Sequence, residues 1–229
     1  MAFGIVVAAG RGERLGATEY KFEVPLLGKP MVWYSLAAFQ EAAGIEALVL
    51  VVPRERLGAW SAEALRGRGI VKALGSVAGG PTRQESVWRG LLQIGATEGD
   101  VVVHDAARPL VTPSLIERVR AGLGRAQGVV AAAPVTDTLK ECSSGRVVRT
   151  VDRASLVAVQ TPQAFRIDAL RRAHEGARGA GFAGTDDASL LERMGEPVLV
   201  EASDRYNMKV TYPEDLAVAE FLLKGRGQR

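Results

Sequence analysis

Short apolar runs alternate along the chain with stretches whose apolar residues recur at helical spacing. Several of the runs are rich in valine and lack polar alternation, which is typical of strands that are covered on both faces. The apolar runs predict strands at residues 4–9, 47–52, 100–104, 129–135, 156–160 and 198–201. The periodic stretches predict helices near residues 31–41, 56–65, 83–94, 114–123, 167–178 and 187–194, and a last helix that begins at Pro213.

The alternation of strands and helices predicts an α/β fold of the Rossmann-like kind with a mostly parallel sheet. Sheets of this kind bind ligands beyond the C-terminal ends of their strands. Because the sequence contains no internal repeat, low-complexity tract or linker, we expect residues 1–229 to form a single domain. The polar segment at about 136–152 is the exception, and it predicts a β-arm that projects from the body of this domain.

The composition narrows the classes of function. Hydrophobic residues make up 47% of the chain, but no apolar run approaches the roughly 20 residues that span a bilayer. The first residues lack the basic region of a signal peptide, so we expect a cytoplasmic protein. Cys142 is the only cysteine, which excludes an intrachain disulfide and argues against a zinc site. The net charge of +3 is scattered and aromatic residues are 6%, so we expect no nucleic-acid groove and no membrane surface.

A glycine-rich loop with the sequence AAGRGERLG follows the first predicted strand at residues 8–16. Small residues let the backbone approach a ligand closely, and successive N–H groups in such a loop can bind phosphates. The loop departs from a dinucleotide fingerprint, because Leu15 stands at the third glycine position and no acidic residue ends the second strand. Arg14 and Lys21 are therefore predicted to face a triphosphate. The alternatives are a simple turn and a surface lysine.

Two further motifs lie at the ends of predicted strands or the starts of helices. Gly79 and Gly80 lead into a helix that carries Ser86, which indicates either a close backbone approach to a base or a plain turn. The sequence HDAARP at residues 104–109 follows a buried strand, where functional residues of this fold class lie. Asp105 could hold Mg²⁺ and Arg108 a second anion, or the two could form a local ion pair.

The remaining polar motifs lie around the predicted arm and before the last helix. They are DTLK at 137–140, VDR at 151–153, TPQ at 161–163, TDDAS at 185–189 and NMKVTYPEDL at 207–216. Capping of a helix is a sufficient explanation for Thr185 or Asp186. Lys209 is a surface lysine unless the fold brings it to the mouth of the sheet.

In their order and content, these motifs resemble those of the 2-C-methyl-D-erythritol 4-phosphate cytidylyltransferase family of the non-mevalonate isoprenoid pathway. The resemblance extends from about residue 5 to about residue 223. HDAARP and NMKVTYPEDL are its specific parts, whereas many nucleotidyltransferases share the glycine-rich loop. The sequence departs from the family pattern in two motifs: Pro81 replaces a common acidic residue, and Tyr20 and Phe22 flank the lysine in place of the usual neighbours.

The resemblance implies a Mg²⁺-dependent transferase that joins CMP from CTP to methylerythritol phosphate, and a homodimer whose arm reaches the partner subunit. It implies that the catalytic cations are Arg14, Lys21 and Lys209. It implies that the nucleotide is bound by Ala8, Ala9, Gly10, Gly80, Ser86, Asp105 and Ala106. It implies that the acceptor is bound by Asp105, Arg108, Thr138, Arg153 and Thr161, and that the metal is held by Asp105.

Three other functions remain open on the sequence. A ribitol 5-phosphate cytidylyltransferase shares most of these motifs, so the motifs alone do not separate the two acceptors. An NAD(P)-dependent oxidoreductase is disfavoured by the missing acid after the second strand and by the basic first loop. A nucleic-acid-binding module is disfavoured by the scattered charges and the few aromatic residues.

Overall fold

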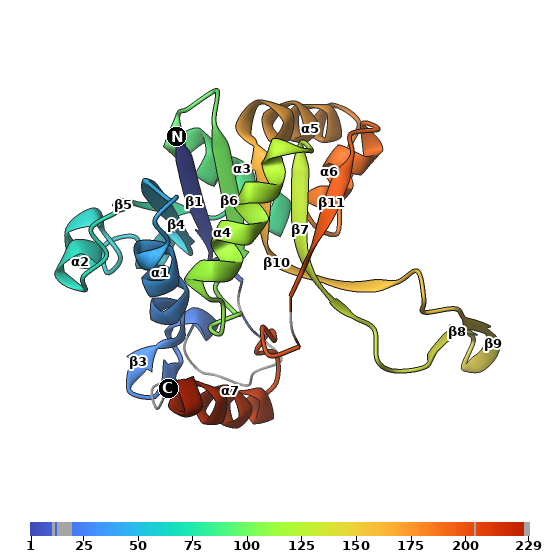
Figure 1. Cartoon of the computed structure of the whole chain (residues 1–229). Helices are drawn as coiled ribbons and strands as arrows, with labels where there is room; N and C mark the ends of the chain where they lie inside the picture. Colours follow the sequence, from blue (N-terminus) through green and yellow to red (C-terminus); the bar gives the residue numbers. More distant parts are fainter. Residues whose placement is uncertain (11, 13–19, 204, 227–229) are drawn as a thin grey trace.

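The computed structural model describes residues 1–10, 12, 20–203 and 205–226. Within them a seven-stranded sheet forms the centre, with the order β11-β7-β10-β6-β1-β4-β5 (Figure 1). Its strands are β1 (Ala2–Val7), β4 (Ala47–Val52), β5 (Ala73–Ala78), β6 (Asp100–Asp105), β7 (Gly128–Pro134), β10 (Val157–Arg166) and β11 (Val198–Ala202). Neighbouring strands are parallel, except that β10 is antiparallel to both β6 and β7. The predicted α/β fold with a mostly parallel sheet is confirmed.

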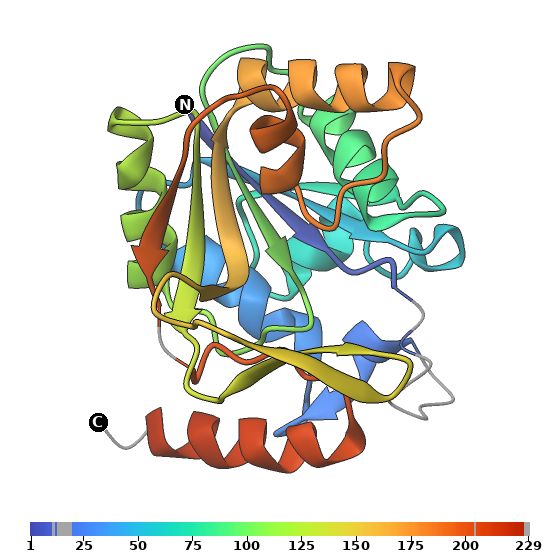
Figure 2. The same cartoon turned by 90° about the vertical axis from the view of Figure 1, so that its right-hand side faces the viewer.

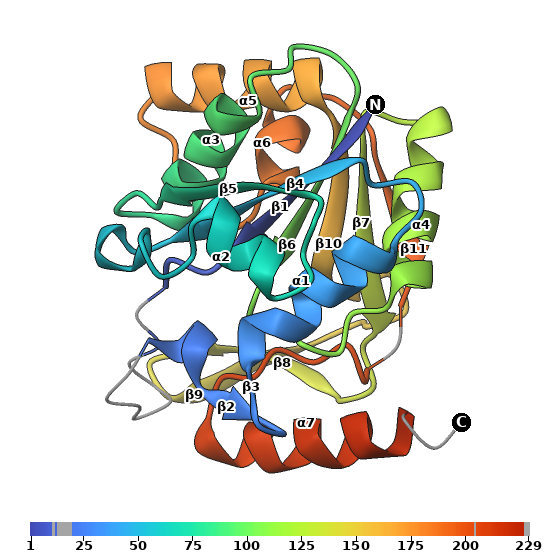
Figure 3. The same ribbon diagram turned by 90° about the vertical axis from the view of Figure 1, so that its left-hand side faces the viewer.

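Helices cover both faces of this sheet (Figures 1 and 3). One face carries α1 (Met31–Glu41), α2 (Ala62–Gly67) and α4 (Pro113–Ala121), and the other carries α3 (Arg83–Ile94), α5 (Ile167–Gly179) and α6 (Ala188–Arg193). Successive strand residues point to opposite faces, so in β4 Leu48 and Leu50 join the first apolar core and Val51 joins the second. Burial on both faces explains why the central strands are continuous apolar runs.

A third, smaller apolar cluster lies beyond the C-terminal ends of the central strands, where α7 (Pro213–Arg226) crosses the molecule (Figure 3). Ala219 of α7 packs there with residues of a small hairpin and of the loop after β6. This part of the chain also contains η2 (Lys21–Glu23), β2 (Pro25–Leu26) and β3 (Lys29–Pro30). The carboxylate of Asp215 accepts hydrogen bonds from Thr211 N at 2.6 Å and Tyr212 N at 2.9 Å, which fixes the start of α7. No helix in the described part of the chain is long and apolar enough to cross a membrane.

The predicted β-arm is present and projects from the body (Figures 1 and 2). It consists of β8 (Leu139–Ser143) and β9 (Arg146–Val151), which pair antiparallel around a turn. Ser144 and Gly145 adopt positive φ angles of 49° and 75° in this turn, a conformation that glycine accepts without a steric penalty. Strand β7 leads into the arm and β10 returns from it, so the arm grows out of the sheet itself.

Some predicted boundaries are wrong. Strand β5 was not predicted, because ALGSVA contains few large apolar residues and forms the edge of the sheet. The helix predicted at residues 56–65 divides into η3 (Arg54–Arg56) and α2, and a further turn, η4 (Gly122–Gly124), follows α4. The strand predicted at residues 156–160 continues to Arg166, past Pro162, where its register with β7 shifts.

Candidate active site

Three loops converge at the C-terminal edge of the sheet, and backbone hydrogen bonds extend the strand ladders into them. Ala8 N donates to Val51 O at 2.8 Å, and Gly79 N donates to Val52 O at 2.8 Å. Ala106 N likewise donates to Val7 O of the neighbouring strand, at 2.9 Å. The first residues of the loops after β1, β5 and β6 are therefore fixed to the neighbouring strands.

These loops surround a cavity of about 600 Å³. The predicted site residues that line it are Ala8, Ala9, Gly10, Lys21, Gly80, Ser86, Asp105, Ala106 and Lys209. Residues far apart in the sequence, such as Lys21 and Lys209, thus lie around one space, as the fold class predicted. Arg14 lies outside the described residues.

Glycine allows two close approaches in this cavity. A Cβ atom on Gly79 would lie 2.2 Å from Ala9 Cβ, so a larger residue would push apart the loops after β1 and β5. Gly12 has a φ angle of +70°, and a Cβ atom there would lie 2.4 Å from Lys21 Cβ. Gly12 therefore lies directly against Lys21.

Ser86 is buried at the start of α3 and fixes the loop that precedes the helix. Its Oγ accepts a hydrogen bond from Gly80 N at 3.1 Å and donates one to Thr82 O at 2.9 Å. The helix itself is capped by Thr82, whose hydroxyl accepts from Glu85 N at 3.1 Å. The hydroxyl of Ser86 thus already holds the backbone of Gly80 at the edge of the cavity.

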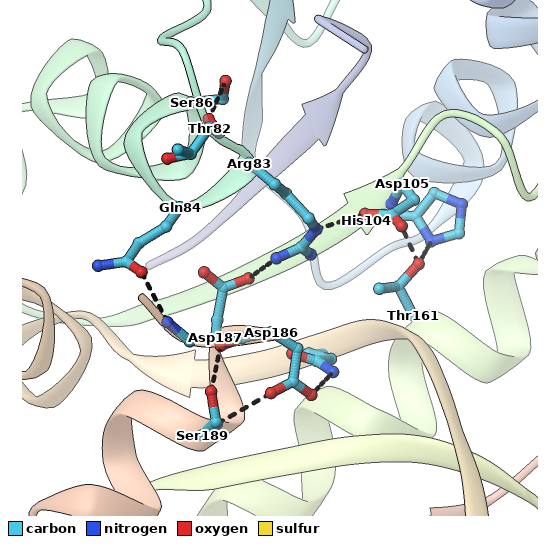
Figure 4. A network of polar contacts seen from close by, with 12 residues as sticks. Thr82, Arg83, Gln84, Ser86, His104, Asp105, Thr161, Asp186, Asp187 and Ser189 are labelled. Carbon is cyan, nitrogen blue, oxygen red and sulfur yellow. Dashed lines mark hydrogen bonds and ion pairs between the residues drawn. The ribbon is translucent and has the colours of Figure 1, made fainter. Parts of the chain in front are cut away.

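Asp105, at the end of β6, lies between two cations, Arg83 and Lys209, and Figure 4 shows its contact with Arg83. Its Oδ1 is 2.8 Å from Arg83 Nε and its Oδ2 is 2.7 Å from Lys209 Nζ. Burial alone would raise the pKa of Asp105, but the charges and hydrogen bonds of Arg83 and Lys209 hold that pKa well below its ordinary value. Asp105 is therefore ionised at neutral pH, and its ion pairs are with these two residues. Arg108 instead donates from Nη1 to Asn207 O at 2.8 Å.

The buried side chains of Thr161 and His104 lie next to Asp105 and hold its backbone in place. Thr161 Oγ1 accepts a hydrogen bond from Asp105 N at 3.0 Å and lies 3.1 Å from His104 Nδ1. His104 Nε2 lies 3.2 Å from Arg108 O, which can only accept, so Nε2 carries the proton and Nδ1 accepts from the Thr161 hydroxyl. Burial lowers the pKa of His104 to about 4, which keeps the imidazole neutral. Thr161 thus lies inside the wall of the cavity, only 5% exposed.

The two predicted acceptor residues of the arm lie elsewhere. Thr138 and Arg153 are exposed at the base of the arm, and neither is among the described residues that line the cavity of this chain. Arg153 Nη1 donates to Thr136 O within the arm. The structure of one chain therefore brings together the residues predicted to bind the nucleotide and the two lysines predicted to be catalytic, but not the residues of the arm.

Arg83 and Asp187 also belong to the site, although the sequence predicted no role for either. Arg83 Nη1 lies 2.7 Å from Asp187 Oδ2, while Arg83 Nε holds Asp105 (Figure 4). The four side chains Lys209, Asp105, Arg83 and Asp187 form a line of alternating charges, here called the charge row. The capping interpretation is confirmed for Asp186, whose Oδ1 accepts from Ser189 N at 2.9 Å. The second acid of TDDAS, which the cap does not need, was the signal that could have revealed the row.

The chemistry of the cavity fits a divalent cation that is held mainly by a ligand. Among the described residues, no group of three or more His, Cys, Asp or Glu side chains could hold a metal ion. Asp105 nevertheless offers an ionised carboxylate at the edge of the cavity. Mg²⁺ is often bound by one or two carboxylates together with phosphate oxygens and waters, so a single aspartate suffices for a nucleotide-bound ion.

Comparison with known sequences identifies close relatives. The family described as IspD, 2-C-methyl-D-erythritol 4-phosphate cytidylyltransferase, matches residues 2–225. The enzyme of that name from Thermosynechococcus vestitus is 42% identical over 98% of this chain and 96% of its own length. The one from Aquifex aeolicus is 44% identical over 97% of this chain and 98% of its own length.

Comparison with solved structures agrees. The crystal structure of 2-C-methyl-D-erythritol 4-phosphate cytidylyltransferase from Thermus thermophilus has a TM-score of 0.78 and 34% identity. The match covers 96% of this chain and 98% of that one. The likeness therefore extends over nearly the whole of both chains.

Proposed function

Because the chain belongs to the 2-C-methyl-D-erythritol 4-phosphate cytidylyltransferase family, we propose that it transfers CMP from CTP to 2-C-methyl-D-erythritol 4-phosphate. The products are pyrophosphate and 4-diphosphocytidyl-2-C-methyl-D-erythritol, an intermediate in the synthesis of isoprenoid precursors. The observation that carries this proposal is the ionised Asp105 between two cations at the edge of a cavity lined by small residues. The relatives described above are named for methylerythritol phosphate, which favours this acceptor over ribitol phosphate.

The cavity suits a pyrimidine nucleotide. Ala8, Ala9 and Gly10 offer backbone groups and little side-chain bulk along one edge, and Gly80 does so along another. The close contact of Gly79 with Ala9 narrows the space between these edges. We infer that cytosine and ribose lie between the two loops, with the triphosphate directed toward Lys21 and Lys209.

The reaction requires two anions to meet. The phosphate of the acceptor attacks the α-phosphorus of CTP in line, and pyrophosphate leaves. Lys21 and Lys209, with Arg14, would neutralise the triphosphate and the charge that develops in the transition state. The attacking phosphate is already ionised, so no general base is needed. His104 could not serve as one, because it is fully buried and both of its ring nitrogens are engaged.

We propose that Asp105 is the protein ligand of a Mg²⁺ ion that enters with CTP. When bound, this ion would neutralise phosphate oxygens near the reacting phosphorus. Lys209 holds Asp105 Oδ2 at 2.7 Å, so the carboxylate is already oriented toward the cavity before the nucleotide arrives. Asp105 would thus hold the ion, and Lys21 and Lys209 would add their charges at the same cavity.

We further propose that the chain forms a homodimer, in which the arm brings Thr138 and Arg153 to the acceptor site of the partner. Both residues are exposed here, and the arm also exposes Val147 and Val148 by 61% and 57% of their surfaces. Arg108 of the body would complete that acceptor site, and the buried Thr161 would support it through its hydrogen bond to Asp105 N. Because CTP is a metabolite of the cell interior, we propose that the enzyme works in the cytoplasm, as one catalytic domain with its arm.

Mixing two inactive variants tests the shared site. In a heterodimer of Lys21→Ala and Arg153→Ala subunits, one site combines an intact body with an intact arm. Random exchange of subunits should restore about a quarter of the wild-type rate, since half of the dimers are mixed and each has one intact site. No recovery after proven exchange would show that Arg153 acts within its own chain.

Pyrophosphate release by the purified protein with Mg²⁺ tests the reaction. The assay crosses CTP, UTP and ATP with methylerythritol phosphate and ribitol phosphate. We expect release only with CTP and methylerythritol phosphate. Faster release with ribitol phosphate would show that ribitol phosphate is the acceptor, with the same mechanism. No release with any pair would refute the proposed reaction.

A further inference from the structure

Arg83 links three elements of the fold through a single guanidinium group. It is the first residue of α3, and it contacts Asp105 at the end of β6 and Asp187 at the start of α6. Nε lies 2.8 Å from Asp105 Oδ1 and Nη1 lies 2.7 Å from Asp187 Oδ2 (Figure 4). A planar guanidinium has donors in fixed directions, so two carboxylates bound to it are fixed relative to one another.

The two carboxylate oxygens of Asp105 have different partners. Arg83 occupies Oδ1, whereas Oδ2 is held by Lys209, whose side chain is 43% exposed at the cavity. The backbone N–H of Asp105 is bound in turn by Thr161 Oγ1 at 3.0 Å. Rotation of the carboxylate would break the contact with Arg83, so Oδ2 remains the oxygen that a ligand meets.

Asp187 holds Arg83 from the opposite side. It is completely buried, and its second oxygen lies 3.5 Å from Nε2 of the equally buried His174. Breaking a buried ion pair by removing one partner leaves an uncompensated charge, which is strongly unfavourable. Arg83 therefore has no low-energy alternative position, and its orientation is set by α6 as much as by its own helix.

We propose that Arg83 is a positioning residue for the transfer reaction: anchored by Asp187, it fixes Asp105 Oδ1, so that Asp105 meets metal and substrate through Oδ2 in one orientation. This inference rests on the proposed function. Arg83 also lines the cavity, but its guanidinium is held by two aspartates, so we assign it an action through Asp105, unlike Lys21 and Lys209.

A double-mutant cycle of Arg83→Gln and Asp105→Asn tests this dependence in kcat/KM. We expect Arg83→Gln alone to lower kcat/KM on the order of 100-fold, because Asp105 loses its buried partner. The double variant should be within about threefold of Asp105→Asn alone, since Arg83 then has no carboxylate to orient. Losses that multiply in the double variant, or an Arg83→Gln enzyme as fast as wild type, would refute the proposal.

Arg83→Lys adds a rescue test. A lysine can restore one charged contact to Asp105 but cannot hold both aspartates, so it should recover roughly tenfold of the loss. The same change on the Asp105→Asn background should recover nothing. Equal recovery on both backgrounds would mean that the charge at position 83 acts without Asp105.

Arg166→Gln is the matched control, because Arg166 Nη1 holds Asp100 Oδ1 at 2.7 Å at the opposite end of the same strand, β6. It should leave kcat/KM near the wild-type value. A crystal structure of Arg83→Gln separates this inference from the proposed reaction, because it requires no activity. The inference requires the Asp105 carboxylate to turn or to adopt several conformers there, and a carboxylate that keeps its place would overturn it even if the enzyme is active.

Discussion

The cavity and the arm each contain an ion pair between an arginine and a carboxylate. Both pairs are close, but they differ in their exposure to solvent. On the arm, Arg149 Nε lies 2.5 Å from Glu141 Oε2, and the side chains are 66% and 50% exposed. At the cavity, Arg83 Nε lies 2.8 Å from Asp105 Oδ1, and the side chains are 27% and 11% exposed. Solvent screens the first pair, which adds at most about 1 kcal/mol, whereas the second has lost most of its hydration.

The comparison shows that distance alone does not rank two ion pairs. The shorter pair is expected to matter less, because water can replace either partner. The longer pair belongs to the charge row, in which each buried group depends on the next. Changes to the exposed pair of the arm should therefore have little effect on the stability of the chain, whereas changes to the pair at the cavity should have a large one.

The two lysines of the cavity should show the largest effects. Loss of a cation that stabilises the transition state costs about 3–4 kcal/mol, so Lys21→Ala and Lys209→Ala should each lower kcat by on the order of a hundredfold or more. The KM for the acceptor should change far less in steady-state kinetics. Lys29→Ala, on β3 with its Nζ over the Trp33 ring, serves as the control and should retain nearly full kcat. An unchanged kcat with only a raised KM would contradict the assignment.

Gly79→Ala tests the contribution of the backbone around the cavity independently of the charged side chains. The new methyl group would overlap Ala9 Cβ and force the two loops apart, a strain of about 1–3 kcal/mol. The KM for CTP should rise roughly tenfold, by the same amount of free energy, and the KM for the acceptor should rise less. Gly176→Ala is the matched control, because nothing lies within 4 Å of its new Cβ on α5, and it should leave both constants unchanged. Equal KM values for CTP in the two variants would show that the close contact is unimportant.

The buried imidazole should appear in the pH dependence of stability. The pKa of His104 is lowered to about 4 in the folded chain, below its unfolded value of about 6.5. The unfolded chain therefore binds more protons between these values, and the stability that is present above pH 6.5 is lost as the pH falls toward 4. Between pH 7 and pH 5, the wild type should lose about 2 kcal/mol more unfolding free energy than His104→Gln.

Urea unfolding at both pH values measures this difference. The other buried histidine, His174, is present in both proteins, so its contribution cancels in the comparison. Equal pH dependence of the two proteins would mean that His104 is not held neutral by burial.

The smallest effect is expected from the exposed pair of the arm. Arg149→Ala should change the unfolding free energy by less than about 1 kcal/mol, because solvent already screens its contact with Glu141. Urea unfolding beside Arg83→Gln at equal protein concentration gives the comparison directly. A loss of more than about 2 kcal/mol from Arg149→Ala would overturn the distinction between the two regions.

The sequence predicted those elements whose own residues form a recognisable pattern, such as an apolar run or a glycine-rich motif. The valine runs of β1, β4 and β6 predicted buried strands, and the glycine loops and HDAARP placed a site at their ends. Strand β5 carries little such signal, since its ALGSVA sequence is only partly buried at the sheet edge. The direction of β10 was also hidden, because pairing between strands is decided by residues far apart in the chain.

The charge row shows the same limit for the site. Arg83 and Asp187 are 104 residues apart, and neither lies in a motif that links it to the other. Only the packing of α3 beside α5 and α6 on one face of the sheet brings their charges together. Asp105 and Lys209 were identified because they belong to specific motifs, whereas their mutual contact could not be read from either motif.

The alternating charges have a consequence for how the enzyme meets its substrates. Two cations and two anions in line largely cancel one another's field at a distance, and salt screens what remains beyond about 8 Å at physiological ionic strength. The row therefore contributes little to the diffusional capture of CTP from solution. Its electrostatic attraction for a distant nucleotide is therefore weak. The individual charges act on the triphosphate only once it has entered the cavity and displaced the water between itself and the charge row.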